Sequence, residues 1–148
     1  MSEKAEFYFS TAQEAEQAFY SAFEACDPEL MEAVWAEGAV SCIHPGAPVI
    51  HGRQQVLSSW QQIFTGAQPP ALKIETISQV AQELLAVHTV IERISADHHI
   101  DSPTTEIIAT NTLVRQENGW RMLQHHASVN IQIEDNYNAT HDAPNALQ

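Results

Sequence analysis

The second half of the chain consists of long segments with strand-like alternation, separated by short polar turns. We predict strands over residues 72–80, 83–96, 104–116 and 120–131. Between the last two, Glu117-Asn118-Gly119 is typical of a hairpin turn. Long strands joined by short connections pair as an antiparallel meander. This half of the chain therefore predicts a curved antiparallel sheet.

The first half of the chain predicts helices. Overlapping capping boxes at residues 10–14 precede apolar residues at helical spacing. Asp27-Pro28 begins a second, short helix, because Asp caps helices and Pro suits their first position. A short strand at residues 40–44 precedes a third helix over residues 52–66. Helices first and strands second indicate an α+β fold, with three N-terminal helices packed on the curved sheet.

Strand alternation also predicts which residues share a face of the sheet. In the first long strand, one face is expected to carry five residues: Leu72, Ile74, Thr76, Ser78 and Val80.

The length of 148 residues suits one domain. We expect a single domain over residues 1–133 and a flexible acidic tail over residues 134–148. Two cysteines, Cys26 and Cys42, are too few for a disulfide framework. The N-terminus has no secretory signal, and no apolar run reaches the roughly 20 residues of a membrane span. The expected location is cytoplasmic.

The net charge is −13, with only six lysine and arginine residues, and this limits the kinds of partner that the chain can bind. Nucleic acids and anionic membranes attract basic surfaces, so neither is predicted to bind. The eight histidines lack the spacing of known metal motifs, and the chain has no glycine-rich phosphate loop. Neither a metal nor a cofactor is therefore predicted.

Several motifs carry a resemblance to a known family. They are residues 35–46, Gly52-Arg53, Ser59-Trp60, Thr110-Asn111 and residues 120–128. In order and spacing they resemble the SnoaL-like branch of the NTF2-like superfamily, which includes ketosteroid isomerase, scytalone dehydratase and polyketide cyclases. The chain is most similar to the members without an assigned activity.

This resemblance implies a cone of three helices on a bent sheet, with one internal pocket and dimers through the outer face of the sheet. It implies a protein that binds a small, largely apolar molecule. Such a protein could be a cofactor-free isomerase, dehydratase, cyclase or hydrolase. The alternative is a non-catalytic ligand-binding or dimerisation module, because one fold hosts many functions.

Ketosteroid isomerase in particular would require a carboxylate base that faces a tyrosine and a protonated acid. The sequence suggests no such set, because Tyr8, Tyr20 and Tyr137 are expected in the N-terminal region, the first helix and the tail. Steroid isomerisation is therefore not predicted.

His88 and Glu92 are the first candidates for catalysis, because they share one face of a predicted strand. If that face lines the pocket, Glu92 could act as a general base and His88 could shuttle the proton. Burial would raise the pKa of the carboxyl group, which suits this role. The alternative is that this face meets solvent or a second copy of the chain.

Other histidines are also candidates. His125 and His126 are adjacent in a predicted strand, so they point to opposite sides. The resemblance favours His126 as the pocket residue, and the alternative is a core or interface histidine. His44, which precedes Pro45 at a strand end, could be a base or ligand contact, or could stabilise the turn.

Four residues are predicted to contact a ligand. Asn111 is unusual in mid-strand, where it could orient a ligand carbonyl, brace Glu92 or hold a bulge. Trp35 and Trp60 belong to apolar helical stripes, and in this family the core lines the cavity. Tyr20, on the first helix, completes the predicted ligand-binding set.

Overall fold

The computed structural model describes residues 6–66 and 68–131. Its helices are α1 (Ala12–Ala25), α2 (Pro28–Val34) and α3 (Arg53–Gly66). Its strands are β1 (Ser41–Ile43), β2 (Ile50–His51), β3 (Ala71–Ala81), β4 (Leu85–Ser95), β5 (Thr104–Gln116) and β6 (Gly119–Val129). None of the helices in this part of the chain is long and apolar enough to cross a membrane. The predicted tail lies outside the described residues.

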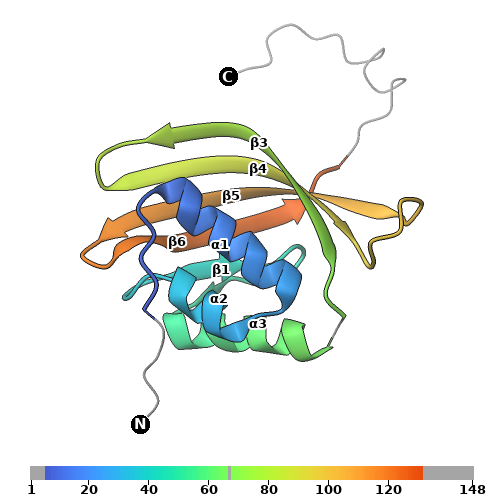
Figure 1. Ribbon diagram of the computed structural model, residues 1–148, viewed down its shortest axis with the longest axis horizontal. Helices are drawn as coiled ribbons and strands as arrows, with labels where there is room; N and C mark the ends of the chain where they lie inside the picture. Colours follow the sequence, from blue (N-terminus) through green and yellow to red (C-terminus); the bar gives the residue numbers. More distant parts are fainter. Residues whose placement is uncertain (1–5, 67, 132–148) are drawn as a thin grey trace, which may run out of the picture.

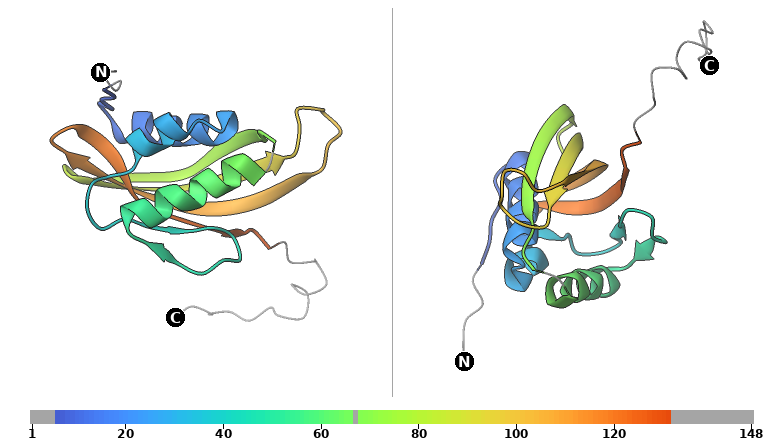
Figure 2. Two further views of the ribbon diagram at one scale, coloured as in Figure 1. Left: turned by 90° about the horizontal axis from the view of Figure 1, so that it is seen from below. Right: turned by 90° about the vertical axis from the view of Figure 1, so that its right-hand side faces the viewer.

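The strands form one sheet in the order β2-β1-β6-β5-β4-β3. The four long strands pair antiparallel, as predicted, whereas β1 runs parallel to β6. The helices lie together on one side of the curved sheet (Figures 1 and 2). This confirms the predicted α+β architecture. The two-residue strand β2 was not predicted, because so short a segment shows no alternation.

Local capping sets the starts of α1 and α2. The side chain of Thr11 accepts a 3.0 Å hydrogen bond from the Glu14 amide, and the Glu14 carboxyl accepts one of 2.7 Å from the Ser10 amide. The Asp27 carboxyl accepts a 3.1 Å hydrogen bond from the Leu30 amide. These side chains satisfy amides that a helix leaves unpaired at its first turn. Both helices therefore begin where the capping signals predicted.

Two bulges change which residues face the interior. In β3 the pairing register shifts between Thr76 and Ser78, which places Val80 on the opposite face from Thr76. The predicted single face of this strand is therefore wrong beyond Thr76. A bulge adds one residue to one strand and so reverses the alternation that follows it.

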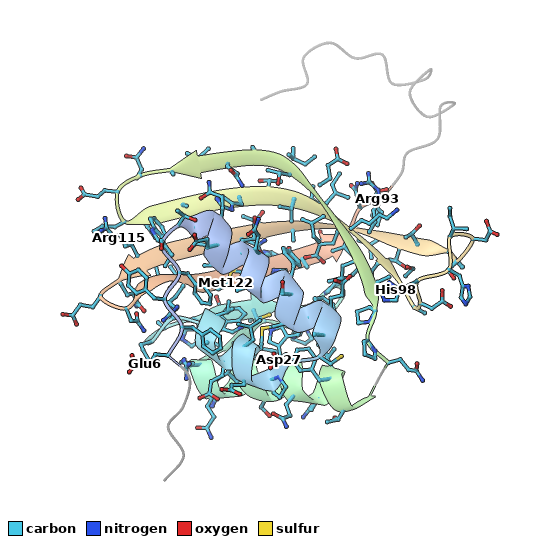
Figure 3. All side chains as sticks on the ribbon, viewed as in Figure 1. Glu6, Asp27, Arg93, His98, Arg115 and Met122 are labelled. Carbon is cyan, nitrogen blue, oxygen red and sulfur yellow. The ribbon has the colours of Figure 1, made fainter. Side chains whose placement is uncertain are left out.

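The second bulge lies in β6, where Leu113 pairs with Met122 but Thr112 pairs with Gln124. Met122, labelled in Figure 3, is fully buried and is consequently on the same face as His125. His125 is 2% exposed, whereas His126 is exposed on the outer face. The expectation that His126 faces the interior is therefore wrong.

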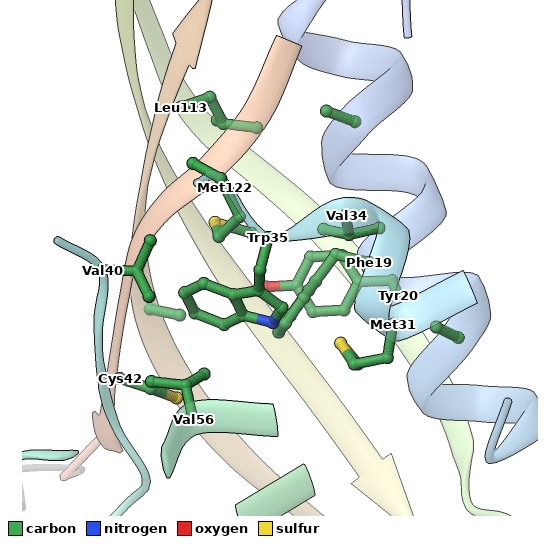
Figure 4. Packing of buried hydrophobic residues seen from close by; sticks show 14 of the residues in the cluster. Phe19, Tyr20, Met31, Val34, Trp35, Val40, Cys42, Val56, Leu113 and Met122 are labelled. Atoms are coloured by element: carbon green, nitrogen blue, oxygen red, sulfur yellow. The ribbon is translucent and has the colours of Figure 1, made fainter. Parts of the chain in front are cut away.

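The interior between helices and sheet is filled by apolar and aromatic side chains (Figure 4). Trp35 and Trp60 are 1% and 2% exposed. The Phe19 ring lies edge-on to both, with centroid distances of 6.2 Å and 5.3 Å. Edge-to-face packing of this kind is favourable between aromatic rings. Both tryptophans are thus core residues, and the polar groups described below lie beside this aromatic core.

Candidate functional site

Six polar side chains meet between α1 and the sheet, and we call them the buried polar network. They are Glu16 and Tyr20 of α1, His88 and Glu92 of β4, Asn111 of β5 and His125 of β6. Each is at most 7% exposed. Strand pairing places His88 opposite Asn111, and Asn111 opposite His125. Residues four apart on a helix share a face, which brings Glu16 and Tyr20 over these strands.

Asn111 is the centre of the network. Its amide nitrogen donates to Glu16 Oε2 at 2.8 Å and to the Tyr20 hydroxyl at 3.0 Å. Its carbonyl oxygen lies 2.6 Å from Nδ1 of His125. Because a carbonyl oxygen only accepts, His125 must donate from Nδ1. Asn111 therefore fixes both the Glu16 carboxyl group and the tautomer of His125.

Tyr20 and Glu92 form the shortest contact to a carboxyl group in the network. The Tyr20 hydroxyl donates to Glu92 Oε2 at 2.6 Å. Nε2 of His125 lies 3.8 Å from the same oxygen. This carboxyl–tyrosine pair was not identified from the sequence, because Tyr20 was expected on a helix and nothing in the sequence indicated its partner.

Burial shifts the pKa of three network residues. It raises the pKa of Glu92 to about 7; the hydrogen bond from Tyr20 opposes this rise, and the charge of Glu16 adds to it. Burial also lowers the pKa of His125 to about 3, so its contact with Glu92 is not an ion pair. Burial and the neighbouring Glu92 raise the pKa of Tyr20 well above its ordinary value. At neutral pH, Tyr20 therefore stays a phenol, while Glu92 can gain or lose a proton.

His88 has unused hydrogen-bonding capacity. Its side chain is fully buried, and Nδ1 lies 3.1 Å from Glu16 Oε1. This contact lacks the angles of a hydrogen bond, and neither ring nitrogen has a hydrogen-bond partner among the described residues. Buried polar atoms without partners are rare in proteins. His88 thus lies beside Glu16 with two ring nitrogens that have no hydrogen-bond partner among the described residues.

A cavity of about 430 Å³ lies between α1 and β3. It is lined by Gln13, Glu16, Gln17, Tyr20, Ser21, Glu24, Leu72, Ile74, Thr76 and Gln79. Two hydrogen bonds join α1 to β3 beside it, from Gln13 to Gln79 at 3.2 Å and from the Leu72 amide to Glu24 at 2.9 Å. Glu16 and Tyr20 are the two network residues in its lining. They connect the cavity with the groups buried behind them.

His44, another predicted site residue, lies against the aromatic core and outside the buried polar network. The His44 ring packs edge-on against Trp60 at 4.9 Å, and Nε2 of His44 lies 3.0 Å from the Ser59 hydroxyl. That hydroxyl donates to the Val56 carbonyl, so His44 must be the donor. Burial lowers the pKa of His44. Its role as a catalytic base stays a prediction.

The structure brings only part of the predicted set together. Glu92, His88, Asn111 and Tyr20 meet in the network, whereas Trp60 lines a separate cavity of about 260 Å³ between α2 and α3. A ring distance of 6.2 Å between Trp60 and His125 links the two regions. In the described part of the chain, no group of three or more His, Cys, Asp or Glu residues has the arrangement of a metal site.

Sequence interpretation missed two members of the network. Glu16 lies on the buried face of α1 among Ala12, Ala15 and Phe19. A carboxyl group within such an apolar stripe was the available signal, because buried acids require partners. His125 was missed because the bulge in β6 has no signature in the sequence.

Comparison with known proteins agrees with this architecture. The family model of the SnoaL-like domain matches residues 13–132, which confirms the resemblance that the motifs suggested. A search of curated proteins found no match.

Among solved structures, a candidate calcium/calmodulin-dependent protein kinase type II association domain from Thiobacillus denitrificans is 37% identical, with a TM-score of 0.78. That alignment covers 86% of this chain and 100% of the other. A candidate dehydratase of the NTF2-like family from Streptomyces avermitilis is 30% identical, with a TM-score of 0.72 and coverage of 80% and 92%. An NTF2-like protein of unknown function from Pseudomonas putida, 17% identical with a TM-score of 0.71 and 92% coverage of both chains, shares the fold.

Proposed function

Since the chain belongs to the SnoaL-like domain family, we propose that it binds a small molecule between α1 and β3 and moves a proton to or from it without a cofactor. The observation that carries this proposal is the Tyr20–Glu92 pair, in which a buried carboxyl group with a pKa of about 7 accepts a 2.6 Å hydrogen bond. A carboxyl group with this pKa is partly protonated at neutral pH, so it can donate to the Tyr20 hydroxyl, which can then donate to a ligand. An isomerase or dehydratase acting beside a carbonyl group requires this chemistry.

The proposed roles follow from which network residues line the cavity. Glu16 reaches the cavity, so its carboxylate takes a proton from the carbon beside a ligand carbonyl. The C–H electron pair then forms the enolate, whose oxygen receives a hydrogen bond from the Tyr20 hydroxyl. Protonated Glu92 in turn donates to Tyr20, which frees that hydroxyl for the ligand. Such fixed donors stabilise charge as it develops in the transition state.

Four residues position these groups without touching the ligand. Asn111 holds Glu16 and Tyr20 at 2.8 Å and 3.0 Å from one amide nitrogen. His125 holds Asn111 at 2.6 Å, and His88 lies 3.1 Å from Glu16 on the side of the sheet. Glu92 acts through Tyr20.

Proton exchange in D2O tests this proposal. We expect the protein to accelerate exchange of the protons beside the carbonyl in some members of a panel of small neutral ketones and enones, followed by NMR. Glu16→Gln and Tyr20→Phe should each reduce the rate by about 10²-fold or more. The control is Glu117→Gln, an exposed glutamate in the β5–β6 turn. Exchange that persists unchanged in both cavity variants would contradict the proposal.

A second candidate function is association through the sheet. The 37% identical relative is described as an association domain, and the outer face of this sheet exposes apolar side chains. Val80 and Val87 pair across β3 and β4 and are 60% and 41% exposed. Covering such a face in a twofold dimer would remove it from water. We propose this homodimer as the working state.

The free thiols of Cys26 and Cys42 suit the reducing cytoplasm, which we propose as the location of the protein.

A further inference from the structure

The cavity between α1 and β3 combines two acidic side chains with neutral polar and apolar ones. Two of its lining residues, Glu16 and Glu24, are acidic and lie about 12 Å apart along α1. Glutamine, serine and threonine side chains lie around them, and the lining contains no lysine, arginine or histidine. A volume of about 430 Å³ falls within the range of small-molecule sites, roughly 300–1,000 Å³. The chemistry of the lining therefore favours a ligand that supplies hydrogen bonds and positive charge.

The arginines of the described residues lie elsewhere. Figure 3 shows Arg93 and Arg115 toward opposite ends of the long strands. Arg93 contacts Glu75 at 2.9 Å, and Arg121 lies 4.9 Å from the centre of the Phe9 ring. The ion-pair contact formed by Glu16 is with His88, which carries charge only when protonated. Glu16 thus has no permanently charged partner among the described residues.

Glu16 is also the better placed of the two acids. It is 6% exposed and is held from the sheet side by the Asn111 amide. Charged hydrogen bonds are stronger in such poorly hydrated surroundings. Glu24 is less buried, and one of its oxygens already accepts from the Leu72 amide. On the opposite wall, Leu72 and Ile74 provide an apolar surface.

We propose that this cavity binds a small organic ammonium ion, with its charge against the Glu16 carboxylate and its apolar body against Leu72 and Ile74. The inference deepens the proposed function by naming the charge class of its ligand, and it rests on that proposal for the choice of cavity. A cationic ligand would place its ammonium group beside the carboxylate that removes the proton.

Three probes of similar shape test the charge preference on the full-length protein at neutral pH and low salt. They are benzylamine, benzyl alcohol and benzoate, each titrated while amide NMR shifts are recorded. We expect benzylamine to bind at least about tenfold more tightly than benzyl alcohol, and benzoate to bind weakest. The shifts should cluster in residues 13–24 and 72–79. Equal affinity for benzoate, or shifts confined to another region, would overturn the inference.

Variants then test whether the ammonium group of benzylamine binds at Glu16 in this cavity. Glu16→Gln keeps an acceptor for Asn111, and should weaken benzylamine about tenfold while leaving benzyl alcohol unchanged. Gln17→Lys adds a cation to an exposed part of the lining without touching the network, so it tests the site even if Glu16→Gln does not fold. It should weaken benzylamine and strengthen benzoate. Glu117→Gln is the control. Unchanged benzylamine affinity in Gln17→Lys would refute the site.

The two proposals can fail separately. Binding of benzylamine at the cavity without any exchange of ketone protons would retain the ammonium site and reject the catalytic role. Exchange of neutral ketones that Glu16→Gln abolishes, without a preference for benzylamine, would retain the catalytic role and reject the ammonium site.

Discussion

Tyr20 and Glu92 lie 72 residues apart in the sequence, yet the Tyr20 hydroxyl donates a 2.6 Å hydrogen bond to the Glu92 carboxyl group. One residue comes from α1 and the other from β4, so packing of the helix on the sheet creates the pair. The carboxyl group is desolvated by this packing and depends on the hydroxyl for part of its stabilisation. The position of α1 and the protonation of Glu92 are therefore coupled.

Tyr20→Phe is expected to raise the pKa of Glu92 above about 7. The hydrogen bond from Tyr20 lowers this pKa, and phenylalanine removes the bond while keeping the ring. A rise of roughly 0.5 to 1 corresponds to a net hydrogen-bond contribution of about 1 kcal/mol. The pKa can be followed by NMR of labelled glutamate carboxyl carbons. Tyr8→Phe, at a tyrosine that is 64% exposed, is the matched control. A lower pKa in Tyr20→Phe would show that the bond does not favour the charged form.

Glu92→Gln is expected to change how stability depends on pH. Below the ordinary pKa of 4.5, the folded and unfolded chains both hold the Glu92 proton; between 4.5 and about 7, only the folded chain holds it. The contribution of Glu92 to the free energy of unfolding therefore falls as pH rises through this window, by roughly 3 kcal/mol. Glutamine does not titrate and can still accept from Tyr20.

Urea unfolding of both proteins at pH 4 and pH 8 measures this effect. At each pH we take the free energy of unfolding of Glu92→Gln minus that of the wild type. This difference should be about 2 to 3 kcal/mol more favourable to the variant at pH 8 than at pH 4. Comparing the two proteins at each pH removes the contribution of His125, whose lowered pKa acts in the opposite direction. If the difference in unfolding free energy between the two proteins is the same at pH 4 and pH 8, Glu92 titrates with its ordinary pKa.

Particular residues show what the sequence predicts and what it does not. Capping residues and alternation are local signals, and they correctly located α1 and α2 and placed His88 and Glu92 on one face. That this face points inward required the tertiary structure. The orientation of His125 depends on a bulge that forms only when β6 pairs with β5, so no local pattern indicates it. The Tyr20–Glu92 pair likewise depends on how α1 crosses the sheet. The positions of the helices and the sharing of a strand face were therefore predictable, whereas the contacts between residues of different elements required the tertiary structure.

Gly119→Ala is expected to destabilise the protein more than Gly46→Ala. Both glycines have positive φ, at 98° and 73°, so both alanines carry a backbone cost of about 1 kcal/mol. A Cβ at Gly119 would lie 2.8 Å from the Phe9 carbonyl oxygen, whereas one at Gly46 would meet nothing within 4 Å. The clash should add about 1 to 2 kcal/mol. Urea unfolding measures the difference, and equal losses would mean that the segment around Phe9 moves away freely.

Val87→Lys is expected to weaken the proposed homodimer. Val87 lies on the outer face of β4, 41% exposed and paired with Val80 of β3, which is 60% exposed. If this face is covered in the dimer, a lysine there would bury an unpaired charge, which is costly. The matched control is Gln54→Lys, which adds the same charge at an exposed position on α3. Sedimentation at micromolar concentration should show a dimer for the wild type and for Gln54→Lys, and mostly monomer for Val87→Lys. A wild-type monomer, or a Val87→Lys dimer of undiminished affinity, would exclude association through this face.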